Sequence, residues 1–110
     1  MFSLDVVDTD RFLGLPTRAQ CLYFHLGMLA DDDGFLSVSP KLLRRSGCGT
    51  DDLDMLADAG YIIRFENEII AIRDWNINNH IPQRQYTPTE YQRERSGLAL
   101  VNGMYRLIQE

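Results

Sequence analysis

The sequence has no apolar run approaching the roughly 20 residues that a membrane-spanning helix requires. Its start, Met-Phe-Ser-Leu-Asp, also lacks the basic and then apolar layout of a secretory signal. These absences favour a cytoplasmic protein that does not act in a membrane. Cysteine and histidine are scarce, and Cys21, Cys48, His25 and His80 stand without a second ligand at metal-binding spacing. We therefore expect ordinary thiols and imidazoles, and no metal or cofactor.

Catalytic patterns are missing as well. The chain offers no Ser or Cys with a plausible base in register, no phosphate-cradling glycine loop and no clustered metal ligands, so we do not expect an enzyme. Asp31, Asp32 and Asp33 are adjacent, unlike the alternating ligands of an EF-hand loop, and they are interpreted as a solvated helix end and turn. Because acids at a helix C-terminus are unfavourable, a specific use would explain them, such as capping a neighbouring helix or holding Arg18 or Arg45.

Basic charge is the other shortage, with 11 Lys and Arg against 16 Asp and Glu and a net charge of −5. Residues 1–33 carry six Asp and two Arg, whereas residues 76–110 carry four Arg and three Glu. A protein that relies on phosphate contacts is usually basic overall. The balance therefore argues against a surface built mainly for nucleic acid.

Apolar spacing predicts helices over most of the first 60 residues. A helical turn at Phe12-Leu13, capped by Asp or Thr in Asp8-Thr9-Asp10, ends at Gly14, and a longer helix over 16–30 has Pro16 at its first position. The longer helix has a second apolar side at Phe24 and Met28, which places it near the middle of the domain. Its main stripe at i, i+3, i+4, i+7 and i+10 is formed by Ala19, Leu22, Tyr23, Leu26 and Leu29.

A second set of elements follows the acidic turn. Residues 35–38 can form one strand, Ser39-Pro40 caps a helix that ends at Gly47, and Thr50-Asp51-Asp52 caps another that ends at Gly60. Two short helices joined by a tight glycine-containing turn are typical of a helix-turn-helix.

Residues 61–73 predict a β-hairpin with its turn at Asn67, which tolerates positive φ. An even-numbered loop would gather most apolar residues on one face and the charges on the other. The apolar face would hold Tyr61, Ile63, Phe65, Ile70 and Ile72. The other face would hold Ile62, Arg64, Glu66, Ile69, Ala71 and Arg73. A hairpin alone is marginal in water, so residues 35–38 are expected to join it as a third strand.

These elements predict an α+β fold, mainly helical, in the form of a winged helix-turn-helix with a two- or three-stranded antiparallel sheet. We expect one domain over 1–110, with 76–110 as an extension packed on it. In that extension a helical turn capped by Thr89, a break at Gly97 and a strand pair around Asn102-Gly103 are expected. Its apolar residues either complete the core or offer a surface for self-association.

Candidate DNA contacts fall into two groups. In the first, Lys41 and Arg45 share a helix face with Arg44 close by, and Arg64, Asn67 and Arg73 lie on the hairpin. The amide-rich segment 76–88 contributes the second group, namely Asn78, Asn79, Gln83, Arg84 and Tyr86. The helix over 50–60 begins with three carboxylates, which phosphate would repel, and this argues against ordinary major-groove reading by that helix.

Three stretches also resemble a known family. LYFHLGMLADDDGF, DWNINNHI after the hairpin, and YTPTEYQRE are similar to the N-terminal domain of the DnaD-like phage replication proteins called replisome organisers. The resemblance covers most of positions 4–95. It implies a winged-helix domain that binds DNA at a phage replication origin and helps to recruit the host helicase or its loader.

The acidic balance supports a different hypothesis on the same fold. The chain could be a protein-interaction or oligomerisation module, including a homodimer, or an acidic phage factor that binds a host nucleic-acid-binding protein.

Overall fold

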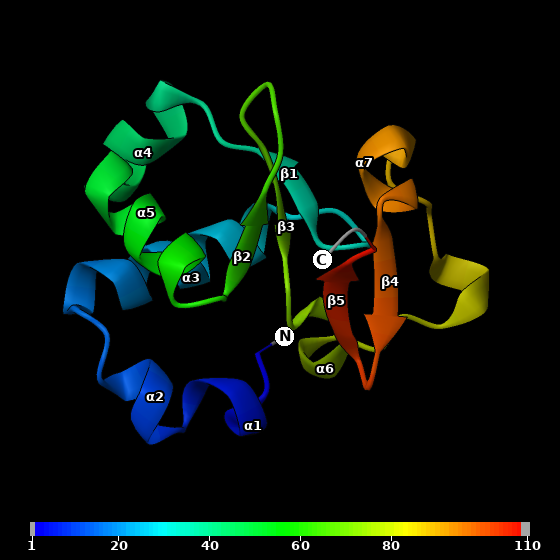
Figure 1. Ribbon diagram of the computed structural model, residues 1–110, viewed down its shortest axis with the longest axis horizontal. Helices are drawn as coiled ribbons and strands as arrows, with labels where there is room; N and C mark the ends of the chain where they lie inside the picture. The colour runs from blue at the N-terminus through cyan, green and yellow to red at the C-terminus, as the bar shows by residue number, and fades with distance from the viewer. Residues whose placement is uncertain (1, 109–110) are drawn as a thin grey trace.

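A computed structural model of the chain describes residues 2–108. Over these residues the fold is a compact α+β arrangement with seven α-helices, one 3-10 turn and two small antiparallel sheets (Figure 1). The helices are α1 (Leu4–Val7), α2 (Asp10–Leu13), α3 (Thr17–Leu29), α4 (Pro40–Ser46), α5 (Thr50–Asp58), α6 (Trp75–Asn78) and α7 (Gln92–Ser96), with η1 at Gln83–Gln85. The strands are β1 (Phe35–Ser37), β2 (Ile62–Arg64), β3 (Ile69–Ile72), β4 (Leu98–Val101) and β5 (Met104–Leu107).

Helix α3 runs through the centre of the core, as its spacing predicts. Ala19, Leu22, Tyr23 and Leu26 are fully buried. The expected last member of the stripe is wrong, because Leu29 is 59% exposed where the helix ends. Met28 beside it is 77% exposed, so the C-terminal end of α3 presents apolar surface outside the core.

Helices α4 and α5 begin and end close to the predicted residues. The Ser39 hydroxyl accepts from the Leu42 N–H at 3.2 Å and Pro40 follows it in the first turn. Gly47 ends α4 with a φ of 76°, a left-handed conformation that only glycine adopts at no steric cost. Helix α5 ends at Asp58, and Gly60 follows with a φ of 83°, as expected of a glycine that closes a helix, whereas the N-cap is Gly49 instead of the expected Thr50.

The larger sheet has the strand order β1-β3-β2, which confirms that residues 35–38 supply a third strand. Both neighbouring pairs are antiparallel. Helices α3, α4 and α5 lie on one side of this sheet, and β4, β5 and α7 lie on the other (Figure 1).

The turn between β2 and β3 differs from the expected even-numbered loop. Asn67 has positive φ, as predicted, and Glu68 shares this conformation at 64°. The Phe65 N–H donates to the Ile69 carbonyl at 2.8 Å, while the Ile69 N–H donates to the Glu66 carbonyl at 3.4 Å. Phe65 and Glu66 therefore both oppose Ile69, and this β-bulge adds one residue to the loop between β2 and β3.

The extra residue changes which side chains share a face, so the predicted grouping is wrong. Cross-strand partners and alternation place Ile62, Arg64, Ile70 and Ile72 on one face. The opposite face holds Ile63, Phe65, Ile69, Ala71 and Arg73. Arg64 and Arg73 therefore project from opposite sides of the hairpin instead of sharing one exposed face.

The second face is covered by the C-terminal hairpin. Strands β4 and β5 are joined by Asn102 and Gly103, both with positive φ, which confirms the strand pair expected there. The Phe35 ring packs against Phe65 and meets Tyr105 edge-on with centroids 5.9 Å apart. Because Leu98 and Tyr105 are buried in the same hydrophobic cluster as α3, part of the extension completes the core.

Candidate nucleic-acid interface

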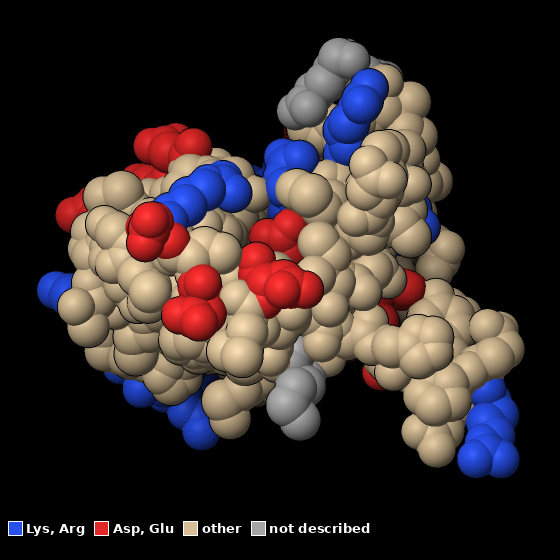
Figure 2. All heavy atoms as spheres, turned by 90° about the horizontal axis from the view of Figure 1, so that it is seen from below, with Lys and Arg blue, Asp and Glu red and all other residues tan. Residues whose placement is uncertain are grey.

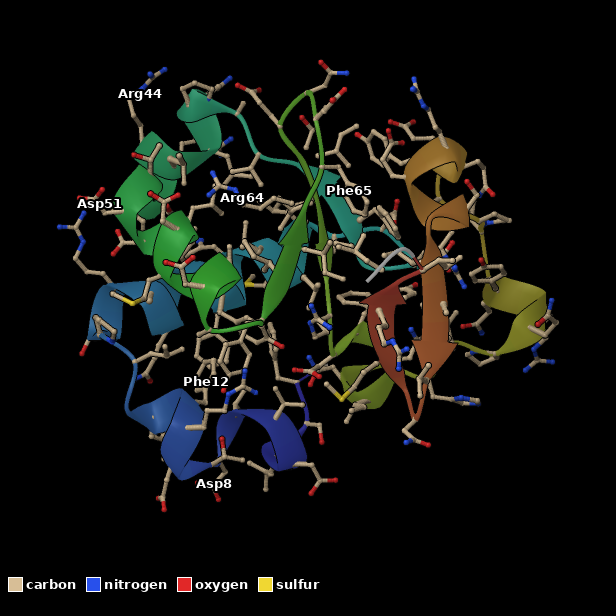
Figure 3. The ribbon with its side chains drawn as sticks, viewed as in Figure 1. Asp8, Phe12, Arg44, Asp51, Arg64 and Phe65 are labelled. Atoms are coloured by element: carbon tan, nitrogen blue, oxygen red, sulfur yellow. The ribbon has the colours of Figure 1, made fainter. Side chains whose placement is uncertain are left out.

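Helix α4 carries the densest exposed basic charge on the described part of the chain. Lys41, Arg44 and Arg45 are exposed, and within residues 2–108 none of them forms an ion pair. Figure 3 shows Arg44 projecting away from the helices into solvent. Arg44 and Arg45 lie in the last turn of α4, where cations interact favourably with the helix dipole.

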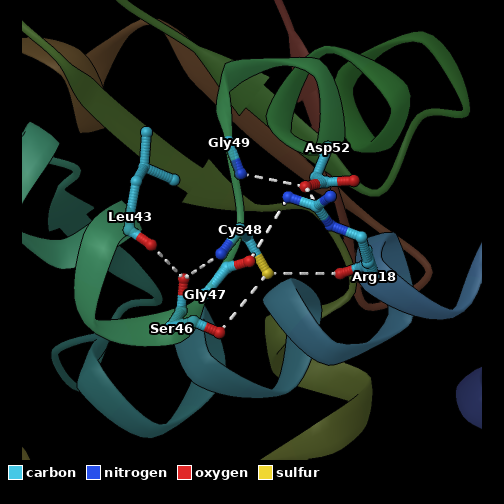
Figure 4. A network of polar contacts seen from close by, with 7 residues as sticks. All are labelled: Arg18, Leu43, Ser46, Gly47, Cys48, Gly49 and Asp52. Carbon is cyan, nitrogen blue, oxygen red and sulfur yellow. Dashed lines mark hydrogen bonds and ion pairs between the residues drawn. The ribbon is translucent and has the colours of Figure 1, made fainter.

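In the acidic first turn of α5, Asp52 is held by contacts within the fold, whereas Asp51 is exposed (Figure 4). The Asp52 carboxylate accepts from the Gly49 N–H at 2.9 Å and pairs with Arg18 of α3 at 3.4 Å. Arg18 also donates to the Gly47 carbonyl, and the Cys48 thiol donates to the Arg18 carbonyl at 3.5 Å. The turn between α4 and α5 is thus fastened to α3, and Asp52 caps the helix as the sequence predicts.

Arg64 points toward the helices and pairs with Asp54 of α5, whereas Phe65 points to the other side of the hairpin (Figure 3). An exposed pair of this kind contributes at most about 1 kcal/mol, but it neutralises the cation. Asn67 stands at the exposed tip between two glutamates. The hairpin therefore offers no concentrated positive surface, contrary to the expected exposed arginine face.

Arg73 faces the C-terminal hairpin. Its guanidinium donates to the Tyr105 carbonyl at 3.0 Å, and its buried Nε–H has no hydrogen-bond partner within residues 2–108. Asp74 is buried next to it, and burial raises the pKa of that carboxyl while Arg11 and Arg73 oppose the rise. Arg73 therefore belongs to an internal contact and not to an exposed wing face.

A structural role also accounts for Asn78, one of the predicted residues in segment 76–88. Asn78 is buried, its amide donates to the Tyr23 hydroxyl at 2.9 Å, and its carbonyl oxygen accepts from the Ser3 N–H at 2.9 Å. A buried amide that joins α3 to the N-terminal segment is not available to read a base. Gln83 and Arg84 are exposed on η1, and Asn79 is partly buried beside α6.

The aspartates of the turn 31–33 hold the extension in place. The Asp33 carboxylate accepts from the Tyr86 hydroxyl at 2.7 Å and from the Thr89 N–H at 2.9 Å. Asp32 accepts from the Thr87 N–H at 2.9 Å, and Asp31 accepts from the Thr89 hydroxyl. We call residues 86–89 the latch segment.

The latch corrects the interpretation of the acidic turn as a solvated helix end. Two of the three resembling stretches, DDDGF and YTPTE, meet in this contact, and the Trp75 indole of the third donates to the Asp32 carbonyl at 2.8 Å. Within residues 2–108, neither Arg18 nor Arg45 forms an ion pair with the turn, and Arg18 pairs with Asp52 instead. No local signal in the sequence points to the latch, because its hydrogen bonds join residues 53 to 58 positions apart.

The latch segment predicts that the Tyr86 hydroxyl ionises at an unusually high pH. The hydrogen bond to Asp33 raises the pKa of Tyr86 to about 12. Because this pKa lies above its unfolded value, the stabilisation is complete below about pH 10 and is lost as the pH rises toward 12. The difference in ultraviolet absorbance between the wild type and Tyr86→Phe should titrate near pH 12, and Asp33→Asn should move the midpoint down toward 10. A wild-type midpoint near 10 would contradict the contact.

Charge on the surface is mixed. Figure 2 views the molecule from the side of α1 and α2, where Asp5, Asp8 and Asp10 are exposed, and acidic and basic groups are interspersed on this face.

Within residues 2–108 there is no group of three or more potential metal ligands, and none of the helices has the length and apolar character needed to cross a membrane.

Comparison with protein-family models, curated proteins and solved structures found no match for this chain.

Proposed function

We propose that this chain is a winged-helix domain that binds DNA through the phosphate contacts of α4. The interpretation as a winged helix is supported by the element order α3, β1, α4, α5, β2, β3 and by the antiparallel pairing of β1 with β3. A role in phage-type replication initiation is supported by the resemblance of three sequence stretches to replisome organisers. The proposed contact with DNA is carried by one observation, the three exposed cations on α4 that form no ion pair within residues 2–108.

The mode of binding follows from the charges around α5. In most helix-turn-helix proteins the second helix enters the major groove with its N-terminal residues. Here that end holds Asp51, Asp52 and Asp54, and the last two are bound to Arg18 and Arg64. Helix α4, not α5, therefore meets the nucleic acid, and contacts with phosphate position the protein without specifying a sequence.

A salt titration tests this proposal. Three phosphate contacts predict that affinity for a labelled duplex falls roughly 40-fold between about 50 and 200 mM salt, from a slope of about −0.9 per contact. In Arg44→Gln/Arg45→Gln the slope should fall by about 1.8, because two contacts are lost. Fluorescence anisotropy measures both quantities.

The matched control is Arg93→Gln/Arg106→Gln, which removes the same charge from exposed positions on α7 and β5. This variant should keep the wild-type slope. The proposal fails if the wild type does not bind at about 50 mM salt, or if the two double variants lose affinity equally.

A further inference from the structure

A groove of about 400 Å³ lies between the C-terminal half of α3 and helix α4. Its walls combine an apolar strip with basic groups. The apolar strip consists of Met28, Leu29 and Leu42, and the basic rim consists of His25, Lys41 and Arg45.

The apolar strip is unusual for its exposure. Met28 and Leu29 are consecutive, are largely exposed, and follow directly on the buried stripe of α3. Burying large aliphatic side chains is favourable, so two such side chains beside a half-buried Leu42 would favour an apolar partner. A phosphate backbone makes no use of this strip, which therefore calls for a different ligand from the one proposed for α4.

The basic rim selects the charge of that ligand. Lys41 and Arg45 lie one helical turn apart on the same side of α4, and within residues 2–108 neither pairs with an acid although acids outnumber bases in the chain. A ligand that placed carboxylates over this rim and aliphatic groups on the strip would complement both features.

We propose that the groove binds an acidic amphipathic helix of a partner protein. Helices fit such grooves by setting apolar residues at i, i+3, i+4 and i+7 into the hollow, which here would place them on Met28, Leu29 and Leu42. Carboxylates on the flanks of that helix would meet Lys41 and Arg45. Because these two cations also belong to the proposed DNA contact, the partner helix and DNA compete for α4.

Peptide binding tests the proposal without DNA. The probe is a fluorescent peptide of about 18 residues, roughly five helical turns, with leucine on one stripe and glutamate elsewhere. One comparison peptide has lysine in place of glutamate, and another has the acidic composition scrambled so that the stripe is lost. The acidic amphipathic peptide should bind saturably and at least about tenfold more tightly than either, a difference of about 1.4 kcal/mol.

Two pairs of substitutions locate the site. Met28→Ser/Leu29→Ser should weaken binding of the acidic peptide about tenfold while leaving duplex affinity unchanged, because it removes the strip and no charge. Leu100→Ser/Val101→Ser removes a comparable exposed apolar pair from β4 and should have no effect. Thermal unfolding of both variants checks that they are folded.

The proposal is overturned if the acidic peptide does not bind saturably, if the scrambled peptide binds equally well, or if Met28→Ser/Leu29→Ser keeps wild-type affinity. Added duplex should displace the peptide, and binding of both together without mutual weakening would overturn the competition. Absence of DNA binding would refute the proposed function and the competition that rests on it, but not the peptide site, since the peptide measurements do not depend on DNA.

Discussion

Replacing Gly34 with alanine is expected to lower the free energy of unfolding by about 3–4 kcal/mol, because two penalties add. Gly34 has a φ of +84°, where a side chain strains the backbone by about 1–2 kcal/mol. A Cβ built at this position would also lie 2.5 Å from the Trp75 ring. The indole cannot move aside cheaply, since it is buried and donates to the Asp32 carbonyl.

Gly47 provides the matched control for this prediction. Its φ of +76° is nearly the same, but a Cβ there would meet no atom within 4 Å. Gly47→Ala should therefore cost only the backbone strain, about 1–2 kcal/mol. Urea unfolding of the two variants separates strain from overlap, and equal losses would show that the Trp75 ring does not press on the turn.

The position of Gly34 illustrates what the sequence could and could not predict. Local signals were sufficient for α3, α4, α5 and both hairpins, because caps, apolar spacing and the positive φ of Asn67 and Gly103 act over a few residues. The sequence predicts a turn at Gly34, but it does not predict that the packing requires glycine there. Its contact with Trp75 joins residues 41 positions apart, and such distant contacts leave no periodic pattern.

The candidate site is also predicted only in part, because some of its features depend on neighbouring residues and others on distant contacts. Exposure of Lys41 and Arg45 on one face follows from helical spacing, and the structure has both on α4. The faces of Arg64 and Arg73 depended on a single bulged residue at the hairpin turn, which alternation alone cannot detect. Asn78 was misread because a buried polar residue is recognisable only by its partners, here Tyr23 and the Ser3 amide.

Some residues thought to contact DNA are thus explained by folding. Tyr86 and Asn78 make hydrogen bonds that span 53 and 55 positions of the chain. Resemblance in the stretches that contain them is equally compatible with shared architecture, since each stretch contributes to the attachment of the extension. The predicted residues that the fold leaves exposed include those of α4, beside the groove, together with Gln83 and Arg84 on η1.

The attachment of the extension yields the second large prediction. Asp33→Ala removes the acceptor for the Tyr86 hydroxyl and the Thr89 N–H. Hydrogen bonds to a charged group contribute about 1.5–3 kcal/mol each, and Tyr86, being only half-buried, can recover part of its loss from water. We therefore expect the free energy of unfolding to fall by about 3 kcal/mol in urea unfolding.

A local measurement distinguishes the latch from a general loss of stability. The Thr89 amide should lose more protection against hydrogen exchange in Asp33→Ala than the amides of α3, because the contact that breaks is its own. Asp58→Ala, at an exposed position near the end of α5, should change stability by no more than about 0.5 kcal/mol. If Asp33→Ala behaves like Asp58→Ala, the Asp33 carboxylate does not anchor the extension. Its attachment must then rest on the contacts of Asp31 and Asp32 and on the packing of the Phe35 and Tyr105 rings.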